Sequence, residues 1–327
     1  MKRALVLGAT GHIGAHVVRA LLAEGHTVRA ASRTEPSRTT LADLPVECVR
    51  VDLETGDGLA RAVDGCDWVF HAAASYPSFV ESPDTALVRA IASTRRALAV
   101  IRRAQPTRVV FTSSAAVIRS VEDRPATEND AEIWPVSGRQ LYATVKIAVE
   151  HEVLQAHRDG LPVILVNPSV CVGEYDARPF SGRLVLVFAK SRMPFYLDLL
   201  LNTIYTGDVG IGHVRAAQRG RVGERYLLTT QAVSLKTFAT LAARAAGVSP
   251  PRWCLPQGAA LALATASEAL ARLTHRDPLL PRQAVLMRQR APRLDASKAR
   301  RELALPHTPI DEAISRAVRW FRSSGML

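Results

Sequence analysis

Cysteine is scarce in this sequence, and the few cysteines stand far apart. The 327 residues include four: Cys48, Cys66, Cys171 and Cys254. Their spacing matches neither the paired ligands of a zinc site nor a disulfide framework. We therefore expect no metal site, and isolated thiols of this kind are typical of proteins of the reducing cytoplasm.

Long apolar runs are also missing. No stretch reaches the roughly eighteen uncharged apolar residues of a membrane-spanning helix. The nearest candidate, 258–273, is interrupted by Glu268 and Arg272. The run after Lys2 and Arg3 is short and ends in a glycine-rich turn, which indicates a strand and not a signal peptide.

Acidic residues are outnumbered, and the formal net charge is +12. A basic chain can attract nucleic acid, but a nucleic-acid surface normally contains a clustered basic patch. Here the basic residues are dispersed, with only short pairs at 95–96, 102–103 and 300–301. We therefore expect no nucleic-acid partner, and we interpret the charge as solvated arginine together with a site for an anionic small molecule.

The order of apolar patterns predicts an α/β fold. Short apolar runs typical of buried strands occur at 4–7, 28–31, 46–51, 68–70, 108–112 and 162–166. Stretches with helical spacing separate several of them, notably 84–104 and 138–158. This alternation predicts a doubly wound parallel sheet with helices on both faces.

The regular alternation stops near residue 170. Helical patterns then predominate, at 234–246, 258–273 and 310–322, and few strands are expected. We expect a dinucleotide-binding domain at 1–168, its sheet completed by parts of 200–230. The remainder, 169–327, would be mainly a smaller, mostly helical substrate-binding lobe over the carboxyl ends of the strands, where ligands bind in such sheets.

A glycine-rich turn links the first predicted strand to the first predicted helix. Its glycines are Gly8, Gly11 and Gly14, and the intervening residues include Thr10, His12 and Ile13. A tight turn at a helix amino terminus lets backbone N–H groups face a pyrophosphate, and the third glycine permits close helix–sheet packing. The strand before and the helix after are the context that this motif requires.

The residues after the next strands indicate which dinucleotide would bind. An NAD site usually has an acidic residue at the end of the second strand, but Ser32 and Arg33 occur here. Arginine can pair with a 2′-phosphate, so NADP is favoured over NAD. Further cofactor contacts are expected from the residues after the third and fourth strands: Asp52, Leu53, Ala72, Ala73 and Ala74.

The candidate catalytic group is a tyrosine–lysine pair. Tyr142 and Lys146 are four residues apart, on one face of the predicted helix. A free phenol is a poor base at neutral pH, and a neighbouring ammonium would lower its pKa. Ser114, at the end of the fifth strand, could hydrogen-bond the substrate oxygen, with Ser113 as the second choice.

Taken in order, these residues resemble the extended short-chain dehydrogenase/reductases, also called the NAD-dependent epimerase/dehydratase family. Within it, the sequence is most similar to the dihydroflavonol-reductase-like branch, and closest to the hopanoid-associated sugar epimerases. The resemblance extends over nearly the whole chain, through motifs such as 8–14, 52–53, 71–73, 112–114, 142–146, 167–173, 223–226 and 295–299. It implies a Rossmann domain, a catalytic set of Ser114, Tyr142 and Lys146, and a nicotinamide site lined by Pro168 and Ser169.

The resemblance has one departure near the catalytic group. The helix before the fifth strand usually carries an asparagine that supports a proton relay through the catalytic lysine, and Ala90 stands there. Family members also often dimerise through two helices, which here correspond to 84–104 and 138–158. A homodimer through these helices is an expectation from the resemblance alone.

Three functions are compatible with the sequence. The first is NADP(H)-dependent reduction of a ketone or aldehyde, in which Tyr142 is the general acid/base. Aromatic residues such as Tyr76 would favour an apolar or aromatic substrate. The second is a nucleotide-sugar epimerase or dehydratase, for which Asn167 could bond a phosphate. The third is a dinucleotide sensor without catalysis, which the intact tyrosine–lysine pair disfavours.

Overall fold

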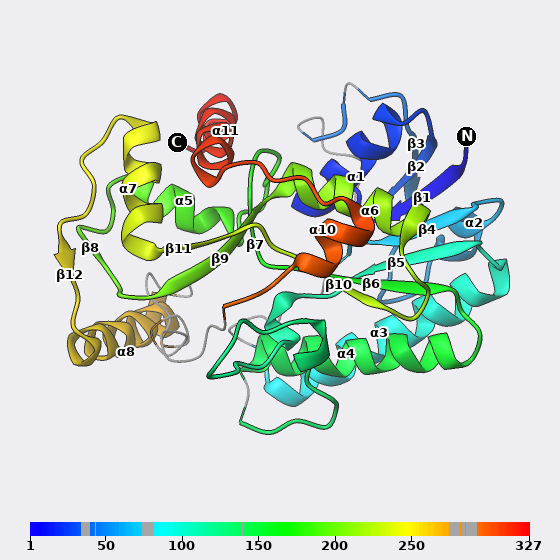
Figure 1. The fold of residues 1–327 in the computed structure, drawn as a ribbon, viewed down its shortest axis with the longest axis horizontal. Coiled ribbons are helices and arrows are strands. Elements are labelled where there is room, and N and C mark those ends of the chain that lie inside the picture. The colour runs from blue at the N-terminus through cyan, green and yellow to red at the C-terminus, as the bar shows by residue number, and fades with distance from the viewer. Residues whose placement is uncertain are drawn as a thin grey trace.

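Seven parallel strands form the main sheet of the protein, seen in a computed structural model (Figure 1). The strand order is β10-β6-β5-β4-β1-β2-β3. The bounds are β1 Arg3–Leu7, β2 Thr27–Ser32, β3 Glu47–Arg50, β4 Trp68–His71, β5 Arg108–Thr112, β6 Val163–Pro168 and β10 Arg225–Leu228. The structure describes residues 1–33, 40–42, 44–73, 81–138, 140–274, 282, 285 and 293–327.

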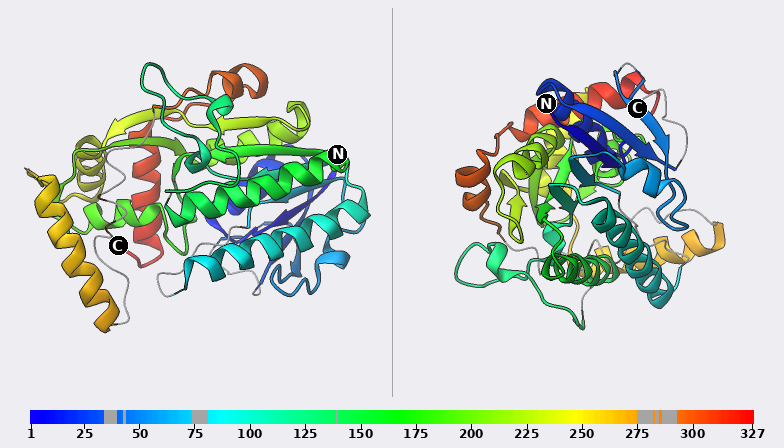
Figure 2. Two further views of the ribbon diagram at one scale, coloured as in Figure 1. Left: turned by 90° about the horizontal axis from the view of Figure 1, so that it is seen from below. Right: turned by 90° about the vertical axis from the view of Figure 1, so that its right-hand side faces the viewer.

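Helices cover both faces of this sheet. One face packs against α1 (His12–Ala23) and α6 (Thr206–Arg219), and α10 (Ser297–Leu303) packs against α6. The opposite face packs against α2 (Leu59–Val63), α3 (Pro83–Ala104) and α4 (Leu141–Arg158). Figure 2 shows α3 and α4 lying side by side along that face. The predicted doubly wound α/β fold is therefore confirmed.

Burial on both faces explains the apolar strands. In β1, the four residues from Ala4 to Leu7 are at most 1% exposed. Ala4 and Val6 belong to the apolar cluster under α1 and α6, whereas Leu5 and Leu7 belong to the cluster under α3 and α4. A strand with two buried faces needs a continuous apolar run, which is the pattern seen in the sequence.

The second part of the chain contains more strands than its sequence pattern indicates. It includes β7 (Val170–Val172), β8 (Phe195–Tyr196), β9 (Leu200–Tyr205), β11 (Gln231–Ser234) and β12 (Trp253–Cys254). The strands β11, β9 and β7 form one small sheet, and β12 pairs with β8. Strands of two to six residues are too short to show a clear period of two, so the expectation of few strands was wrong.

Three helices of this lobe were predicted closely: α7 (Leu235–Ala246), α8 (Gln257–Thr274) and α11 (Ile310–Ser323). The sequence patterns did not predict α5 (Gly182–Ala189). Ser234 caps α7, because its hydroxyl accepts a hydrogen bond from the N–H of Thr237 at 3.1 Å. The apolar face of α11 is buried against α7, α5 and β9.

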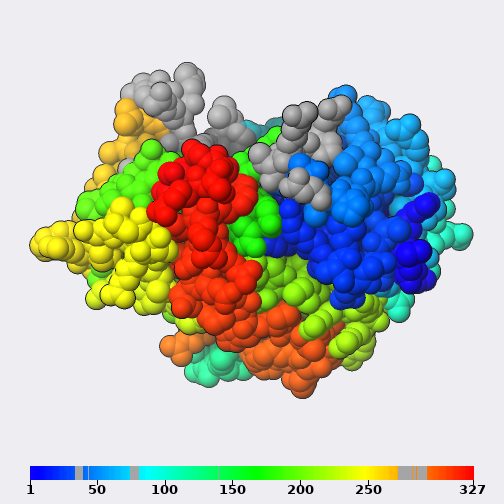
Figure 3. Space-filling view, turned by 90° about the horizontal axis from the view of Figure 1, so that it is seen from above, coloured from blue at the N-terminus to red at the C-terminus, as the bar shows by residue number. Residues whose placement is uncertain are grey.

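The lobe lies at the carboxyl ends of the main strands. Strand β6 continues through Ser169 directly into β7 of the small sheet. Figure 3 shows α11, in red, lying between the rest of the lobe and the blue amino-terminal part of the chain. Ligands of doubly wound sheets bind at this end of the strands, so a ligand site is expected between the sheet and the lobe.

Candidate active site

The glycine-rich turn has the geometry of a phosphate loop. Gly8 has a φ of +79°, and a Cβ on it would lie 2.7 Å from the backbone nitrogen of Ala73. A Cβ on Gly14 would lie 2.1 Å from the carbonyl oxygen of Gly8. Gly11 is the residue before α1 and has no side chain to cap it. The glycines therefore let the turn pack closely against the protein backbone, and the uncapped first amides of α1 can face an anion.

The end of β2 lies beside this turn. The N–H groups of Gly8 and Ala9 donate hydrogen bonds to the carbonyl of Ala31, at 3.0 and 3.1 Å. The next residue, Ser32, is buried, and Arg33 is exposed. The strand therefore ends in a hydroxyl, followed by a guanidinium, where an NAD site usually has a carboxylate that binds the ribose.

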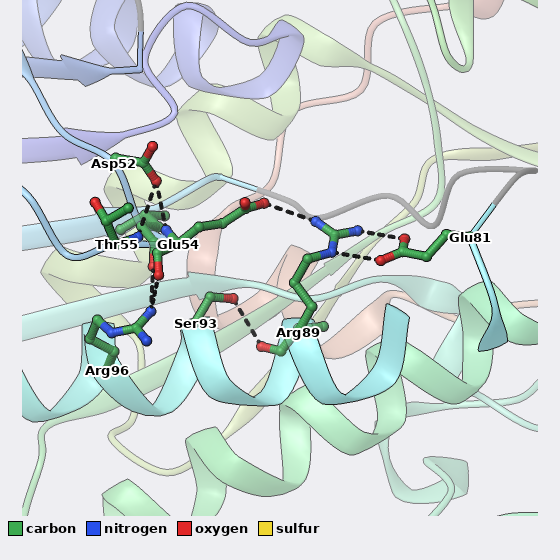
Figure 4. Close-up of polar contacts among 9 residues, drawn as sticks. Asp52, Glu54, Thr55, Glu81, Arg89, Ser93 and Arg96 are labelled. Atoms are coloured by element: carbon green, nitrogen blue, oxygen red, sulfur yellow. Dashed lines mark hydrogen bonds and ion pairs between the residues drawn. The ribbon is translucent and has the colours of Figure 1, made fainter. Parts of the chain in front are cut away.

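The loop after β3 is held in one conformation by its own aspartate and by α3 (Figure 4). The carboxylate of Asp52 accepts hydrogen bonds from the N–H of Glu54 at 2.7 Å and of Thr55 at 3.4 Å. The Arg96 guanidinium, from α3, donates to the carbonyls of Leu53 and Glu54. The two predicted adenine-side residues, Asp52 and Leu53, thus belong to a well-fixed turn.

A second arginine of α3 joins that loop to the start of the helix. Arg89 donates two hydrogen bonds of 2.8 Å to the Glu81 carboxylate and one of 2.9 Å to Glu54 (Figure 4). Such a bidentate pair fixes direction as well as distance. No local sequence pattern predicts this contact, because its partners come from three separate segments.

Tyr142 and Lys146 lie together on the first turns of α4. The Lys146 Nζ is 6.0 Å from the centroid of the Tyr142 ring. It also donates a long hydrogen bond, 3.5 Å, to the Thr112 carbonyl at the end of β5. Burial lowers the pKa of Lys146 to about 8. The predicted pairing of the two side chains therefore occurs, with an ammonium that is easily neutralised.

A buried carboxylate lies on α4 beyond Tyr142 and Lys146. Glu150 is one turn beyond Lys146 and only 2% exposed, and its negative charge opposes the pKa depression of Lys146. It forms an ion pair with Arg225 of β10. Its other oxygen accepts a hydrogen bond from the Asn167 amide at 3.0 Å. Sequence reasoning missed Glu150; the signal was an acidic residue four positions after the lysine.

Asn167 connects this carboxylate to the predicted substrate-binding serine. Its Nδ2 also donates to the Ser114 carbonyl at 3.1 Å, and its side chain is fully buried. The structure therefore places Asn167 behind Ser114, and its amide hydrogens are directed at protein acceptors rather than at an open surface. The predicted phosphate contact of Asn167 has no geometric support in this arrangement.

Ser114 follows β5 and starts a short 3-10 helix at Ala115–Val117. Its Oγ accepts a hydrogen bond from the N–H of Ala116 at 3.2 Å, and the residue is 9% exposed. Two residues earlier, at the end of β5, the Thr112 hydroxyl pairs with His213 of α6 at 2.8 Å. Burial lowers the pKa of His213 to about 4, so this imidazole is neutral at physiological pH.

Some of the remaining predicted residues lie near the sheet edge or near Tyr142, and others lie outside the part of the chain that the structure describes. Pro168 ends β6, and the Ser169 hydroxyl donates to Thr229 at 3.0 Å, both at the carboxyl edge of the sheet. Phe180, which is 61% exposed, lies 6.1 Å from Tyr142 between ring centroids. Tyr76 and Ala74 lie outside the described residues.

The His12 side chain, in the glycine-rich turn, contacts the second part of the chain. Its ring points away from the phosphate loop, to the Thr206 hydroxyl at 2.9 Å and the Asp176 carboxylate at 3.6 Å. Burial lowers the pKa of this imidazole, although the nearby carboxylates of Asp176 and Glu174 oppose the shift. The side chain therefore connects the phosphate loop to the lobe, and only the backbone of His12 remains available for a pyrophosphate.

Two further features that a protein of this size can have are a metal site and a membrane-spanning helix. Within the described ranges, no three His, Cys, Asp or Glu side chains gather closely enough to hold a metal ion. Among the helices so described, none combines the length and the apolar character needed to cross a membrane.

Comparison with known proteins agrees with this geometry. The model of the NAD-dependent epimerase/dehydratase family matches residues 4–227. A Synechocystis protein provisionally named a dihydroflavonol 4-reductase is 33% identical, over 98% of this chain and 94% of its own. Sterol demethylase protein B of Methylococcus capsulatus is 32% identical over 99% of both. A solved nucleoside-diphosphate-sugar epimerase from Pseudomonas aeruginosa is 29% identical, covers 100% of this chain and 99% of its own, and has a TM-score of 0.82.

The chain therefore belongs to the NAD-dependent epimerase/dehydratase family, the extended short-chain dehydrogenase/reductases. It is an NAD(P)-dependent enzyme of the reductase and epimerase type.

Proposed function

We propose that this enzyme reduces a ketone or aldehyde with NADPH, and that Tyr142 is its general acid/base. The observation that carries the proposal is the Lys146 Nζ, 6.0 Å from the Tyr142 ring centroid and hydrogen-bonded to the end of β5. A buried ammonium favours the charged phenolate over the neutral phenol, which lowers the pKa of the phenol. The pair stands at the edge of the sheet where the phosphate loop also lies.

Each residue of the set has one task. The Tyr142 hydroxyl donates a proton to the substrate oxygen, and the Lys146 ammonium stabilises the phenolate that remains. The Ser114 hydroxyl orients the same oxygen. A bound nicotinamide supplies the hydride. The Glu150–Asn167 pair holds the Ser114 backbone from behind, through the hydrogen bond of 3.1 Å.

The phosphate loop fits a dinucleotide, because Cβ atoms at Gly8 and Gly14 would collide with neighbouring backbone. The amides of the first turn of α1, at residues 12–14, would hold the pyrophosphate, and the turn at Asp52 and Leu53 would contact the adenine. We infer a preference for NADP from the exposed Arg33 and from Ser32 at the end of β2. Residues 1–168, with β10, form the cofactor domain in this proposal, and 169–327 form mainly the substrate lobe.

The substrate class follows from the side chains near Tyr142. Phe180 lies beside the phenol ring, with the two ring centroids 6.1 Å apart. This arrangement favours a small apolar or aromatic carbonyl compound. The Synechocystis relative is named for a reductase, which agrees with this choice.

One observation favours a second function. The Pseudomonas aeruginosa structure, named a nucleoside-diphosphate-sugar epimerase, shares 29% identity over the whole chain. An epimerase would use the same Tyr142 to remove and return a proton, with no net change in the cofactor.

The experiment that tests both functions measures cofactor and product together. The protein is incubated with NADPH or NADH and a panel of aromatic ketones and aldehydes, and separately with NADP+ or NAD+ and a panel of nucleotide sugars, because an epimerase must first oxidise its sugar. Consumption of NADPH with formation of an alcohol supports the reductase. An isomerised sugar without net consumption supports the epimerase, and binding of NADPH with neither product would contradict both enzymatic proposals.

We also propose how two copies of the chain assemble. The helices α3 and α4 run parallel and side by side, with ion pairs from Arg95 to Glu152 and from Arg102 to Asp159, and Val88 on the second turn of α3 is 67% exposed. A homodimer through these two helices would cover it. Light scattering gives the mass directly, and a monomer at micromolar concentration would contradict this proposal.

A further inference from the structure

Two buried polar side chains without partners lie on the face of the sheet that carries Lys146. His71, at the end of β4, is 4% exposed, and neither ring nitrogen has a hydrogen-bond partner among the described residues. Ser113, just after β5, is 5% exposed, and its hydroxyl likewise has none within those ranges. Buried polar atoms of folded proteins nearly always have a partner, either protein or ordered water.

Strand geometry directs both side chains to the same side. His71 is the register partner of Phe111, and the two rings stack with centroids 4.6 Å apart. Side chains alternate along a strand, so Ser113 lies on the same face as Phe111. The N–H of Ser113 still donates to the Val166 carbonyl at 2.8 Å, which continues the ladder of β5 with β6. Both groups therefore face the layer formed by α3 and α4.

The third group of this cluster is the Lys146 ammonium. It carries three N–H donors, yet its hydrogen bond within the described chain is the long contact of 3.5 Å to Thr112. Its positive charge is close enough to contribute to the depressed pKa of His71, although burial is the larger cause and lowers that pKa to about 4. His71 is therefore a neutral imidazole that offers a lone pair.

We propose that His71 and Ser113 bind one water molecule that accepts a hydrogen bond from the Lys146 ammonium. The donors and acceptors match. The ammonium donates to the water oxygen, and the two O–H groups of the water donate to a ring nitrogen of His71 and to the Ser113 Oγ. Buried waters of this kind typically make about three hydrogen bonds.

The role of this water follows from the proposed function, on which the inference rests. A buried ammonium is stabilised by each hydrogen bond that it donates, so the water keeps Lys146 charged beside Tyr142. Besides His71, the charged or titratable groups near Lys146 among the described residues are Tyr142 and Glu150 of α4. From α3, Ala90 joins the same apolar cluster and provides no polar side chain. His71 is thus a positioning residue that acts through the water.

A crystal structure of the cofactor-free protein tests the water directly. We expect an ordered water within about 3 Å of the Lys146 Nζ, a His71 ring nitrogen and the Ser113 Oγ. In the His71→Phe variant, which preserves the stacking on Phe111, this water should be lost. A well-ordered wild-type site in which these atoms have no shared water would overturn the inference, whatever the enzyme's substrate.

The pH dependence of carbonyl reduction tests the role. In His71→Phe, the alkaline loss of kcat should move to lower pH by about one unit, because one hydrogen bond to the ammonium is removed. The KM for NADPH should stay within about twofold. His71→Asn keeps an acceptor and should restore most of the wild-type profile. A His71→Phe profile identical to that of the wild type would overturn the inference.

The control variant is His26→Phe. The His26 imidazole lies beside Trp68 at the other end of β4, with ring centroids 4.9 Å apart and ring planes tilted by 57°. Its substitution should leave the profile unchanged. Circular dichroism of all variants checks folding, and His71→Asn stays informative if the phenylalanine variant does not fold. A wild-type protein that reduces no carbonyl compound would contradict the proposed function, and the crystallographic water would still decide this inference.

Discussion

The strongest quantitative prediction concerns Glu150, the buried carboxylate behind the catalytic lysine. Its side chain is 3% exposed and forms an ion pair with Arg225, which is 22% exposed. It also accepts the hydrogen bond from Asn167. Removing one partner of a buried ion pair destabilises a protein by about 3–5 kcal/mol, because the other charge is left uncompensated. Arg225 retains some water, so we expect Glu150→Ala to lower the free energy of unfolding by about 3 kcal/mol.

The same helix provides a matched control. Glu152, two residues further on, forms a bidentate pair with Arg95, whose side chain is 67% exposed. Exposed ion pairs contribute at most about 1 kcal/mol, so Glu152→Ala should cost far less than Glu150→Ala. Guanidinium denaturation followed by circular dichroism measures both losses. Equal losses in the two variants would refute the reasoning that burial determines the difference.

Glu150 should also affect the pH dependence of activity. Burial lowers the pKa of Lys146 to about 8, and the Glu150 charge raises it. In Glu150→Gln, which keeps the acceptor for Asn167 but removes the charge, the pKa of Lys146 should fall below about 8. The ammonium is then lost at lower pH, so the alkaline decline in reduction rate should begin earlier. A decline that stays in place, or moves to higher pH, would contradict the assigned charge on Lys146.

Three further predictions concern cofactor binding, and a fluorescence titration with NADPH or NADH measures each. Arg33→Ala should weaken NADPH by about 10-fold to 100-fold, the value of one or two charge-assisted hydrogen bonds, and leave NADH nearly unchanged; equal losses would contradict the NADP preference. Arg89→Ala should weaken both cofactors several-fold, because Glu54 and Glu81 lose their common partner, whereas Arg95→Ala on the same helix should have no effect. Gly8→Ala should abolish binding of both, because a Cβ there meets the Ala73 backbone at 2.7 Å, and retained binding would show that the loop does not hold the pyrophosphate.

The fold could be predicted from the sequence because its main strands are buried on two faces. Runs such as 4–7 and 163–166 leave few alternatives to a parallel sheet, and the glycine spacing identifies the turn between β1 and α1. The strands of the two small sheets, β7, β8, β9, β11 and β12, could not be predicted in this way. They are short, and pairing with distant partners determines them rather than any local pattern.

The site was predicted where one local pattern contains the chemistry. Tyr142 and Lys146 are a helical turn apart, so their proximity follows from helix geometry alone. Glu150 was missed because an acidic residue on a helix usually faces solvent, and only Arg225 on a strand 75 residues away explains its burial. The contact of His12 with Thr206 spans 194 residues in the same way. Long-range polar contacts of this kind have no signature in a single sequence.

The most direct test of the account is the turnover of Tyr142→Phe, measured with NADPH and a carbonyl substrate accepted by the wild type. Because phenylalanine keeps the ring but has no proton to donate, we predict the loss of at least about 100-fold in kcat, with NADPH affinity within a few-fold of wild type. Undiminished turnover in this variant would contradict the central claim that the phenol is the acid/base.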